Sequence, residues 1–167
     1  MKALPKDKEG LKAAEDLKPD DDDLEPDEIY AIMDSGSGVH GGRKGVHFKG
    51  YKVQPNRASR NGHTCIAACG TIMKRRGECR VNAEIGGEVH RINFDDIDID
   101  TPVLSVRKIV RNGNHVRMQR GGGYIKNKKT GKRLYVVEKQ GVYFIKLKIL
   151  EPDQEDVNLE EVFARQG

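Results

Sequence analysis

The triplet Asp34-Ser35-Gly36 is the part of the sequence best suited to chemistry. It follows a nearly all-apolar run, residues 29–33, which predicts a strand buried on both faces and ending at Asp34. Ser37 and Gly38 extend the run of small residues, which allow a substrate backbone to come close. The pattern predicts a carboxylate at the floor of a cleft. On its own, the triplet is far more typical of a strand-end turn with a solvated aspartate.

Two carboxylates that share one proton can hydrolyse a peptide bond without a metal or a covalent nucleophile. One of them takes a proton from water while the other donates a proton to the carbonyl oxygen. The chain has a single Asp-Ser-Gly triplet, because in Asp100-Thr101-Pro102 a proline replaces the small residue. A single copy implies that chemistry of this kind would need a homodimer.

The elements that would position this triplet are mostly strands, because β-branched and aromatic residues recur in short runs separated by turn residues. One helix is expected over residues 105–113, between a serine cap and an Asn-Gly stop. Hairpin turns are expected at Asn61-Gly62, Gly86-Gly87 and Thr130-Gly131. The predicted fold is all-β, a closed antiparallel barrel with one short helix. The expected strands are residues 29–33, 46–48, 64–68, 80–85, 89–94, 134–137 and 142–147.

Four stretches in this order resemble the retropepsins, the aspartic proteases of retroviruses and retrotransposons, and most closely their copia-type branch. Residues 34–40 are similar to the branch's Asp-Ser-Gly-x-x-x-His signature, and Asn61-Gly62 to a dipeptide in its next hairpin. Residues 102–106 resemble its Leu-Leu-Ser-Val block, and residues 130–144 hold its closing Thr-Gly and Gly-Leu-Tyr segments, here Thr130-Gly131 and Gly141-Val142-Tyr143. The resemblance covers about residues 30–150 and implies an acid-protease barrel.

The resemblance also implies roles for individual residues. Asp34 of each subunit would form the catalytic dyad, Ser35 would brace it by hydrogen bonding, and Gly36 would offer its backbone to the substrate. The hairpin around Asn61-Gly62 would be a flap that closes over an extended peptide. The residues expected to contact that peptide are Ser37, Asn61, Gly62, Val103 and Leu104. The implied activity is endopeptidase cleavage in polyprotein processing, with no cofactor.

The segment after the triplet and the three cysteines lead to further predictions. His40 is interpreted as a hydrogen-bonded turn histidine, and Gly38, Gly41 and Gly42 predict a loosely held segment after the triplet. The three cysteines, an odd count, predict free thiols in a reducing compartment. Their spacing matches no zinc finger or zinc knuckle, so no metal is expected.

Charge divides the 167-residue chain into three parts. Residues 1–28 are read as an acidic leader or linker, residues 29–150 as the protease-like domain, and residues 151–167 as an acidic tail in which a short docking helix is an alternative. The net charge of +4 conceals −6 over residues 1–29, about +15 over residues 30–150 and −5 over residues 151–167. No apolar run is long enough to span a membrane, and the start lacks a signal peptide, so a cytoplasmic protein is expected.

Two rival functions stay open, and the basic middle of the chain supports the first, nucleic-acid binding. Residues 74–76 and 126–133 carry clusters of lysine and arginine that would bind nucleic acid without sequence preference. The aromatic residues considered for base stacking are Tyr51, Tyr124, Tyr135 and Phe144. The second rival is a catalytically inactive retropepsin-like module that dimerises.

Overall fold

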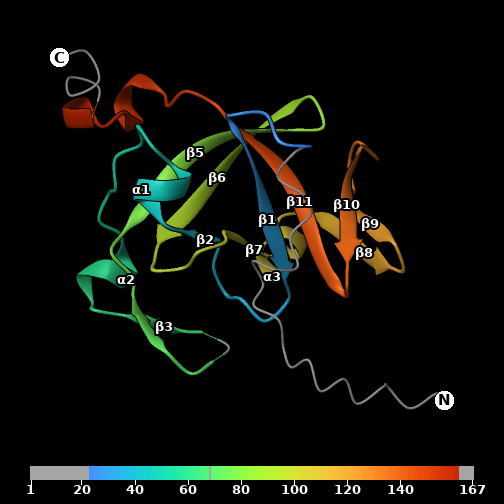
Figure 1. Cartoon of the computed structure of the whole chain (residues 1–167), viewed down its shortest axis with the longest axis horizontal. Helices are drawn as coiled ribbons and strands as arrows, with labels where there is room; N and C mark the ends of the chain where they lie inside the picture. Colours follow the sequence, from blue (N-terminus) through green and yellow to red (C-terminus); the bar gives the residue numbers. More distant parts are fainter. Residues whose placement is uncertain (1–22, 68, 162–167) are drawn as a thin grey trace.

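The computed structural model describes residues 23–67 and 69–161 (Figure 1). Nine strands form one large sheet in the order β1-β7-β2-β6-β5-β11-β10-β9-β8, and two form a separate hairpin, β3-β4. The strands of the large sheet are β1 (Glu28–Asp34), β2 (Gly41–Gly42), β5 (Glu78–Ile85), β6 (Glu88–Asp96), β7 (Val103–Ser105), β8 (Asn114–Gln119), β9 (Gly122–Asn127), β10 (Arg133–Lys139) and β11 (Val142–Ile149). The hairpin strands are β3 (Thr64–Ile66) and β4 (Ile72–Lys74).

The large sheet curves into a partial ring, because β1 pairs with β11 on one side and with β7 on the other. The mostly-β prediction is confirmed. Short helices complete the described chain: α1 (Lys44–His47), α2 (Arg57–Arg60), α3 (Val106–Arg111) and the 3₁₀ turn η3 (Gln154–Asp156).

Alternation along β5 explains how the core is filled. Cys79, Val81, Ala83 and Ile85 are buried, and the residues between them are partly exposed. This period of two is that of a strand with one face on a hydrophobic core. β5 turns into β6 at Gly86-Gly87, the predicted hairpin, where both φ angles are positive at 58° and 82°.

The expected helix is confirmed as α3. Ser105 caps it, because its hydroxyl accepts the backbone N–H of Lys108 at 3.2 Å, and Asn112 ends it. This cap places β7 and α3 in direct succession. The predicted strand at residues 46–48 is wrong, because this segment forms α1. There the backbone N–H of Lys44 donates to a buried carboxylate, that of Asp96, at 2.9 Å.

Residues 151–161, expected to be part of an acidic tail, pack against the domain. Asp156 is 1% exposed, and its carboxylate accepts from Arg91 at 2.5 Å and from Gln54 at 3.1 Å. Val157 forms an isolated bridge with Tyr51. The C-terminal segment therefore neutralises part of the basic middle. The alternative of a docking helix rests on Val157, Leu159, Val162 and Phe163. Residues 159–161 are helical, and Glu161 accepts the backbone N–H of Gly50 at 2.5 Å. Val162 and Phe163 lie outside the described residues, as do residues 1–22 of the acidic leader.

Within residues 23–67 and 69–161, no helix combines the length and the apolar character needed to cross a membrane.

Candidate active site

Asp34 is the last residue of β1, where the strand leaves the sheet. β7 runs parallel to β1, with Met33 opposite Leu104 and Asp34 opposite Ser105. The Asp34 carboxylate is half-buried and accepts the backbone N–H of Gly36 at 2.8 Å. A carboxylate held in this way has one side fixed by its own turn and the other open to a ligand. Ser35 and Gly36 are exposed beside it.

Asp34 differs from the other aspartates of the ring in its partners. Asp95 and Asp96 pair with Arg75 and Arg76, at 2.5 Å and 3.0 Å, and both are buried. In the described part of the chain, Asp34 has no cationic partner. Its carboxylate is therefore not part of the ion-pair network that stabilises the fold.

The loop after the triplet is tied to β7 at two points. The Ser105 hydroxyl donates to the Ser37 carbonyl at 2.7 Å, and the Ser105 backbone N–H donates to Nδ1 of His40 at 2.9 Å. The His40 carbonyl in turn accepts the backbone N–H of Asp95, on β6, at 2.8 Å. Ser105 thus bonds to both ends of residues 37–40 while it caps α3. The interpretation of His40 as a hydrogen-bonded turn histidine is confirmed.

His40 is buried and packs against Phe94, with ring centroids 6.0 Å apart. Burial, with a smaller contribution from the nearby charge of Lys108, lowers the pKa of His40 from 6.5 to about 4. At neutral pH the imidazole is uncharged, and its Nδ1 is free to accept the Ser105 N–H.

The expectation of a loosely held segment is wrong for Gly41 and Gly42. Both are buried in β2, which pairs with β6 and β7. A Cβ at Gly41 would lie 2.6 Å from Ile97, and one at Gly42 would lie 2.4 Å from Phe48. These glycines are needed for close packing. Gly38 alone has open space around it.

The predicted hairpin tip at Asn61-Gly62 is also wrong. Asn61 is the C-cap of α2, and Gly62 follows with φ at 67°. The error has a physical source, because an Asn-Gly pair satisfies a helix end as well as a tight hairpin turn. The hairpin itself lies a few residues later, where β3 and β4 pair through Cys65 and Met73.

The β3–β4 hairpin stands apart from the large sheet (Figure 1). In that view, it and the loop after β1 both lie at the lower end of the molecule. Ile66 and Ile72 face each other across it and are 73% and 68% exposed. Sequence reasoning missed these two apolar side chains, although both belong to short β-branched runs. They offer a contact surface for an apolar ligand.

The remaining predicted contact residues lie under the loop. Val103 is half-buried and pairs with Ile32 and Gly41. Leu104 is 2% exposed and belongs to the core. Its side chain therefore packs in the core beside the strand that carries Asp34, and very little of it is exposed for contact with a substrate.

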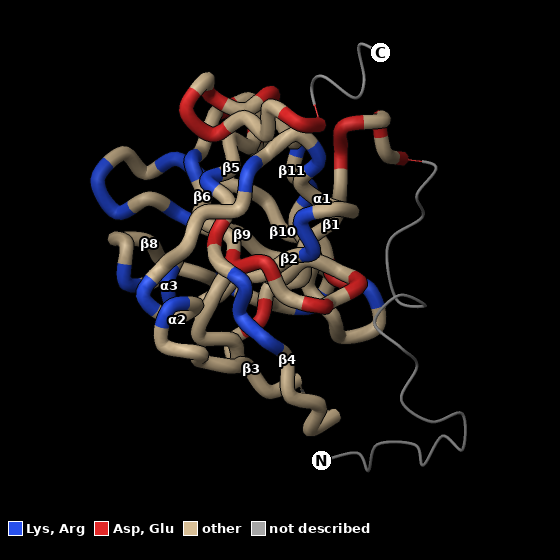
Figure 2. Tube along the Cα trace, turned by 90° about the vertical axis from the view of Figure 1, so that its left-hand side faces the viewer, with Lys and Arg blue, Asp and Glu red and all other residues tan. Residues whose placement is uncertain are grey.

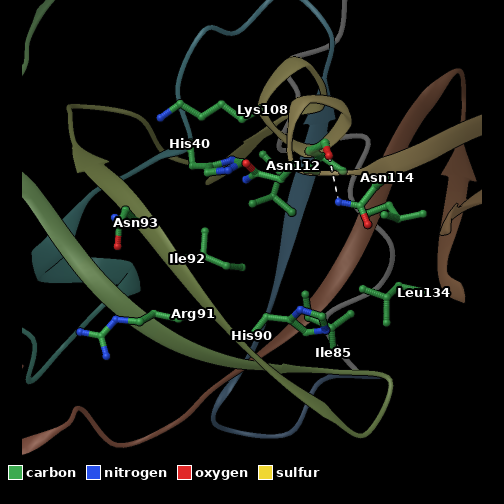
Figure 3. Close-up of a pocket in the computed structure, with 13 residues that line it drawn as sticks. His40, Ile85, His90, Arg91, Ile92, Asn93, Lys108, Asn112, Asn114 and Leu134 are labelled. Atoms are coloured by element: carbon green, nitrogen blue, oxygen red, sulfur yellow. Dashed lines mark hydrogen bonds between the residues drawn. The ribbon is translucent and has the colours of Figure 1, made fainter. Parts of the chain in front are cut away.

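A pocket of about 360 Å³ lies between β6 and α3 (Figure 3). His40, Lys108 and Asn112 line one end, and Ile85 and His90 lie at the other (Figure 3). Its lining contains neither Asp34 nor any other carboxylate. This hollow of the single chain is thus separate from the aspartate.

The described cysteines form no metal site among themselves. Cys79 is buried in the core, and burial raises the pKa of its thiol to about 12. Cys69 is exposed at the hairpin tip, and Cys65 is half-buried. Among the described residues, the one group of potential ligands is Asp153, Glu155 and Asp156, where Arg91 already pairs with all three carboxylates.

Comparison with protein-family models, with curated proteins and with solved structures finds no match to this chain.

Proposed function

We propose that this chain is an aspartic endopeptidase of the retropepsin type, active as a homodimer in which Asp34 of each protomer supplies one carboxylate. The partial ring would then be an acid-protease barrel. The observation that carries the proposal is Asp34 itself, which ends a buried strand and accepts a hydrogen bond from Gly36 at 2.8 Å. It has no cationic partner in the part of the chain that the structure describes.

The chemistry needs a second carboxylate. When two protomers meet at the exposed Ser35-Gly36 turn, two Asp34 side chains come together and repulsion between like charges favours one shared proton. The ionised carboxylate takes a proton from water as the water oxygen attacks the peptide carbonyl. The protonated carboxylate donates to the carbonyl oxygen. Collapse of the intermediate breaks the C–N bond as the nitrogen is protonated.

The surroundings support positioning of such a dyad. The hydrogen bonds of Ser105 to Ser37 and His40 fix the loop that follows Asp34. A loop fixed in this way holds reacting groups in a defined position. The β3–β4 hairpin, with Ile66 and Ile72 exposed, takes the flap role in place of Asn61-Gly62. Apolar side chains there favour peptide bonds flanked by apolar residues.

The test is cleavage of an unstructured protein at about pH 5 by the wild type and by Asp34→Asn. The matched control is Asp100→Asn, because Asp100 is 70% exposed and belongs to the Asp-Thr-Pro triplet that lacks the small residue. We expect Asp34→Asn to abolish cleavage and Asp100→Asn to preserve it. Cleavage retained in Asp34→Asn, or absent from the folded wild type, would overturn the assignment.

A further inference from the structure

We propose that the outer face of strands β8, β9 and β10 binds single-stranded nucleic acid. Side chains on one face of a sheet recur every second residue. The face, called here the β8–β10 face, consists of His115, Arg117, Gln119, Tyr124, Lys126, Arg133, Tyr135 and Val137. The partners on the inward side, such as Ile125 and Val136, are buried in the core.

The strand register places cations and tyrosines in adjacent cross-strand rows. One row is Arg117, Tyr124 and Tyr135, and the next is His115, Lys126 and Arg133. Residues directly opposite one another on a sheet have their Cβ atoms about 5 Å apart. Each tyrosine therefore has a cationic side chain within reach.

The two tyrosines differ in how much of their rings is free. The Arg133 guanidinium lies 4.2 Å from the ring centroid of Tyr124, and a hydrogen bond from Arg117 lowers the pKa of the Tyr124 hydroxyl. Tyr135 is 71% exposed, an unusual exposure for a side chain of its size on a sheet. Its ring is open to stacking on a planar ligand.

A shallow hollow of about 420 Å³ lies beside Tyr135. Its floor is the glycine run 121–123, and Gln119, Arg120, Tyr124 and Arg133 also line it. A Cβ at Gly123 would lie 1.9 Å from the Arg117 carbonyl, and one at Gly122 would lie 2.4 Å from the Val136 carbonyl. Close strand packing excludes a side chain at both positions. Gly122 lies in the outward row, opposite Gln119 and Val137, so no side chain fills the hollow there.

None of the eight residues that define the β8–β10 face is acidic, and a carboxylate at the hollow, that of Glu138, accepts the backbone N–H of Gly121 at 2.8 Å. Two arginines outside the face are paired with carboxylates: Arg76 pairs with Asp96 and Asp98, and Arg91 pairs with Asp153 and Asp156. Blue segments gather around α3 and β8 in Figure 2. The turn after β9 adds Lys128 and Lys129 at the edge of the face. Cationic side chains, with no acidic residue among them, therefore share this face with the exposed tyrosine.

Single-stranded nucleic acid fits this combination of groups. Its phosphates match Arg117, Lys126 and Arg133, and its unstacked bases can lie on the Tyr135 ring. A duplex keeps its bases stacked inside and cannot use an exposed tyrosine in this way. Tyr51 and Phe144, which the sequence also offered for stacking, are both 0% exposed and take no part.

The test is the fluorescence anisotropy of labelled oligonucleotides of about 20 nucleotides, with oligo(U) RNA and oligo(dT) DNA in separate arms. We expect Tyr135→Ala to weaken binding about tenfold and Tyr135→Phe to bind as the wild type does, since stacking needs the ring and not the hydroxyl. Removal of Arg117 should make the slope of log K against log salt shallower by about 0.7 for each phosphate that this arginine neutralises. The RNA and DNA arms show which sugar the face accepts.

The matched charge control compares Arg117→Glu with Arg107→Glu, an exposed arginine on α3 outside the face. Both change the net charge equally, and we expect the larger loss of affinity from Arg117→Glu. Equal losses, equal binding of a duplex of the same length, or unchanged binding by Tyr135→Ala would overturn the proposal. The proposal would also be overturned if a second copy of the chain occupies the β8–β10 face. That result would be detected as a dimer that dissociates when Tyr135 is replaced in Tyr135→Ala. Asp34→Asn should bind as the wild type does, so this test is independent of the protease assay.

Discussion

Protonation of His40 should loosen the loop that follows Asp34. In the folded chain the neutral ring accepts the Ser105 N–H at 2.9 Å, and burial lowers its pKa from 6.5 to about 4. The unfolded chain therefore binds more protons between these two pH values, and the free energy of unfolding falls as the pH decreases through this range. The stabilisation is fully present above about pH 6.5 and lost below about pH 4.

The size of this loss of stability follows from the difference between the pKa of His40 in the unfolded chain and its pKa in the folded chain. Each pH unit corresponds to about 1.4 kcal/mol, so the full loss is about 3 kcal/mol, and about 2 kcal/mol of it has occurred by pH 5. His40→Asn is the informative variant, because the asparagine side-chain oxygen can take the place of Nδ1 as acceptor and does not titrate. It loses the ring contact with Phe94, but that cost does not depend on pH.

The assay is urea unfolding of the wild type and His40→Asn at about pH 7 and about pH 5. Carboxylates elsewhere titrate alike in both proteins and cancel in the comparison. We expect the wild type to lose about 2 kcal/mol more than the variant between the two conditions. An equal loss in both proteins would refute the role of His40 as a neutral acceptor.

Three further predictions concern other parts of the molecule. Asp156→Asn should lower the free energy of unfolding by about 3 kcal/mol in chemical denaturation, because it removes the buried carboxylate that pairs with Arg91. Glu155→Gln, at an exposed partner of the same arginine, should change the free energy of unfolding by less than about 0.5 kcal/mol. Gly123→Ala should cost about 2 kcal/mol or more in thermal unfolding, because its Cβ meets the Arg117 carbonyl, and Gly38→Ala, with open space around it, should melt as the wild type does. A maleimide at about pH 7 should modify Cys69 before Cys79, as measured by peptide mass spectrometry. A hydrogen bond with Thr71 lowers the pKa of the exposed Cys69 thiol, and burial raises the pKa of the Cys79 thiol. Equal labelling of the two cysteines in the native protein would contradict this prediction.

Local patterns predicted the central strand and the helix correctly. Residues 29–33 have no polar interruption, so β1 could be placed to within a residue, and Ser105 and Asn112 bounded α3. β8 and β9 were not predicted, because their outer faces are polar and β9 begins with two glycines, Gly122 and Gly123, in place of apolar residues. Their pairing depends on register across the sheet, which no local pattern contains.

The position of the candidate site could be proposed from the sequence, but the contacts that support it could not. The Asp34 triplet was singled out because four stretches together resemble the retropepsins, since the triplet alone is more typical of a strand-end turn. The bonds between Ser105 and residues 37 and 40 join positions more than 60 apart in sequence, and they could not be inferred from either segment. The Asn61-Gly62 error arose because one dipeptide suits two kinds of chain reversal, and the capping box of Asn56 and Ser59 just before it forms a helix, α2, that Asn61 ends.

Mixing wild-type and Asp34→Asn protomers tests most directly whether two Asp34 carboxylates act together. If activity needs both, an equal mixture at fixed total protein retains about one quarter of the wild-type rate, since only dimers of two wild-type protomers cleave. Unfolding and refolding the two proteins together ensures that their subunits assort at random. An equal mixture with Asp100→Asn, treated in the same way, should retain the full rate and controls for losses during refolding. A rate of about one half with Asp34→Asn, the value expected when each protomer acts alone, would contradict the shared dyad.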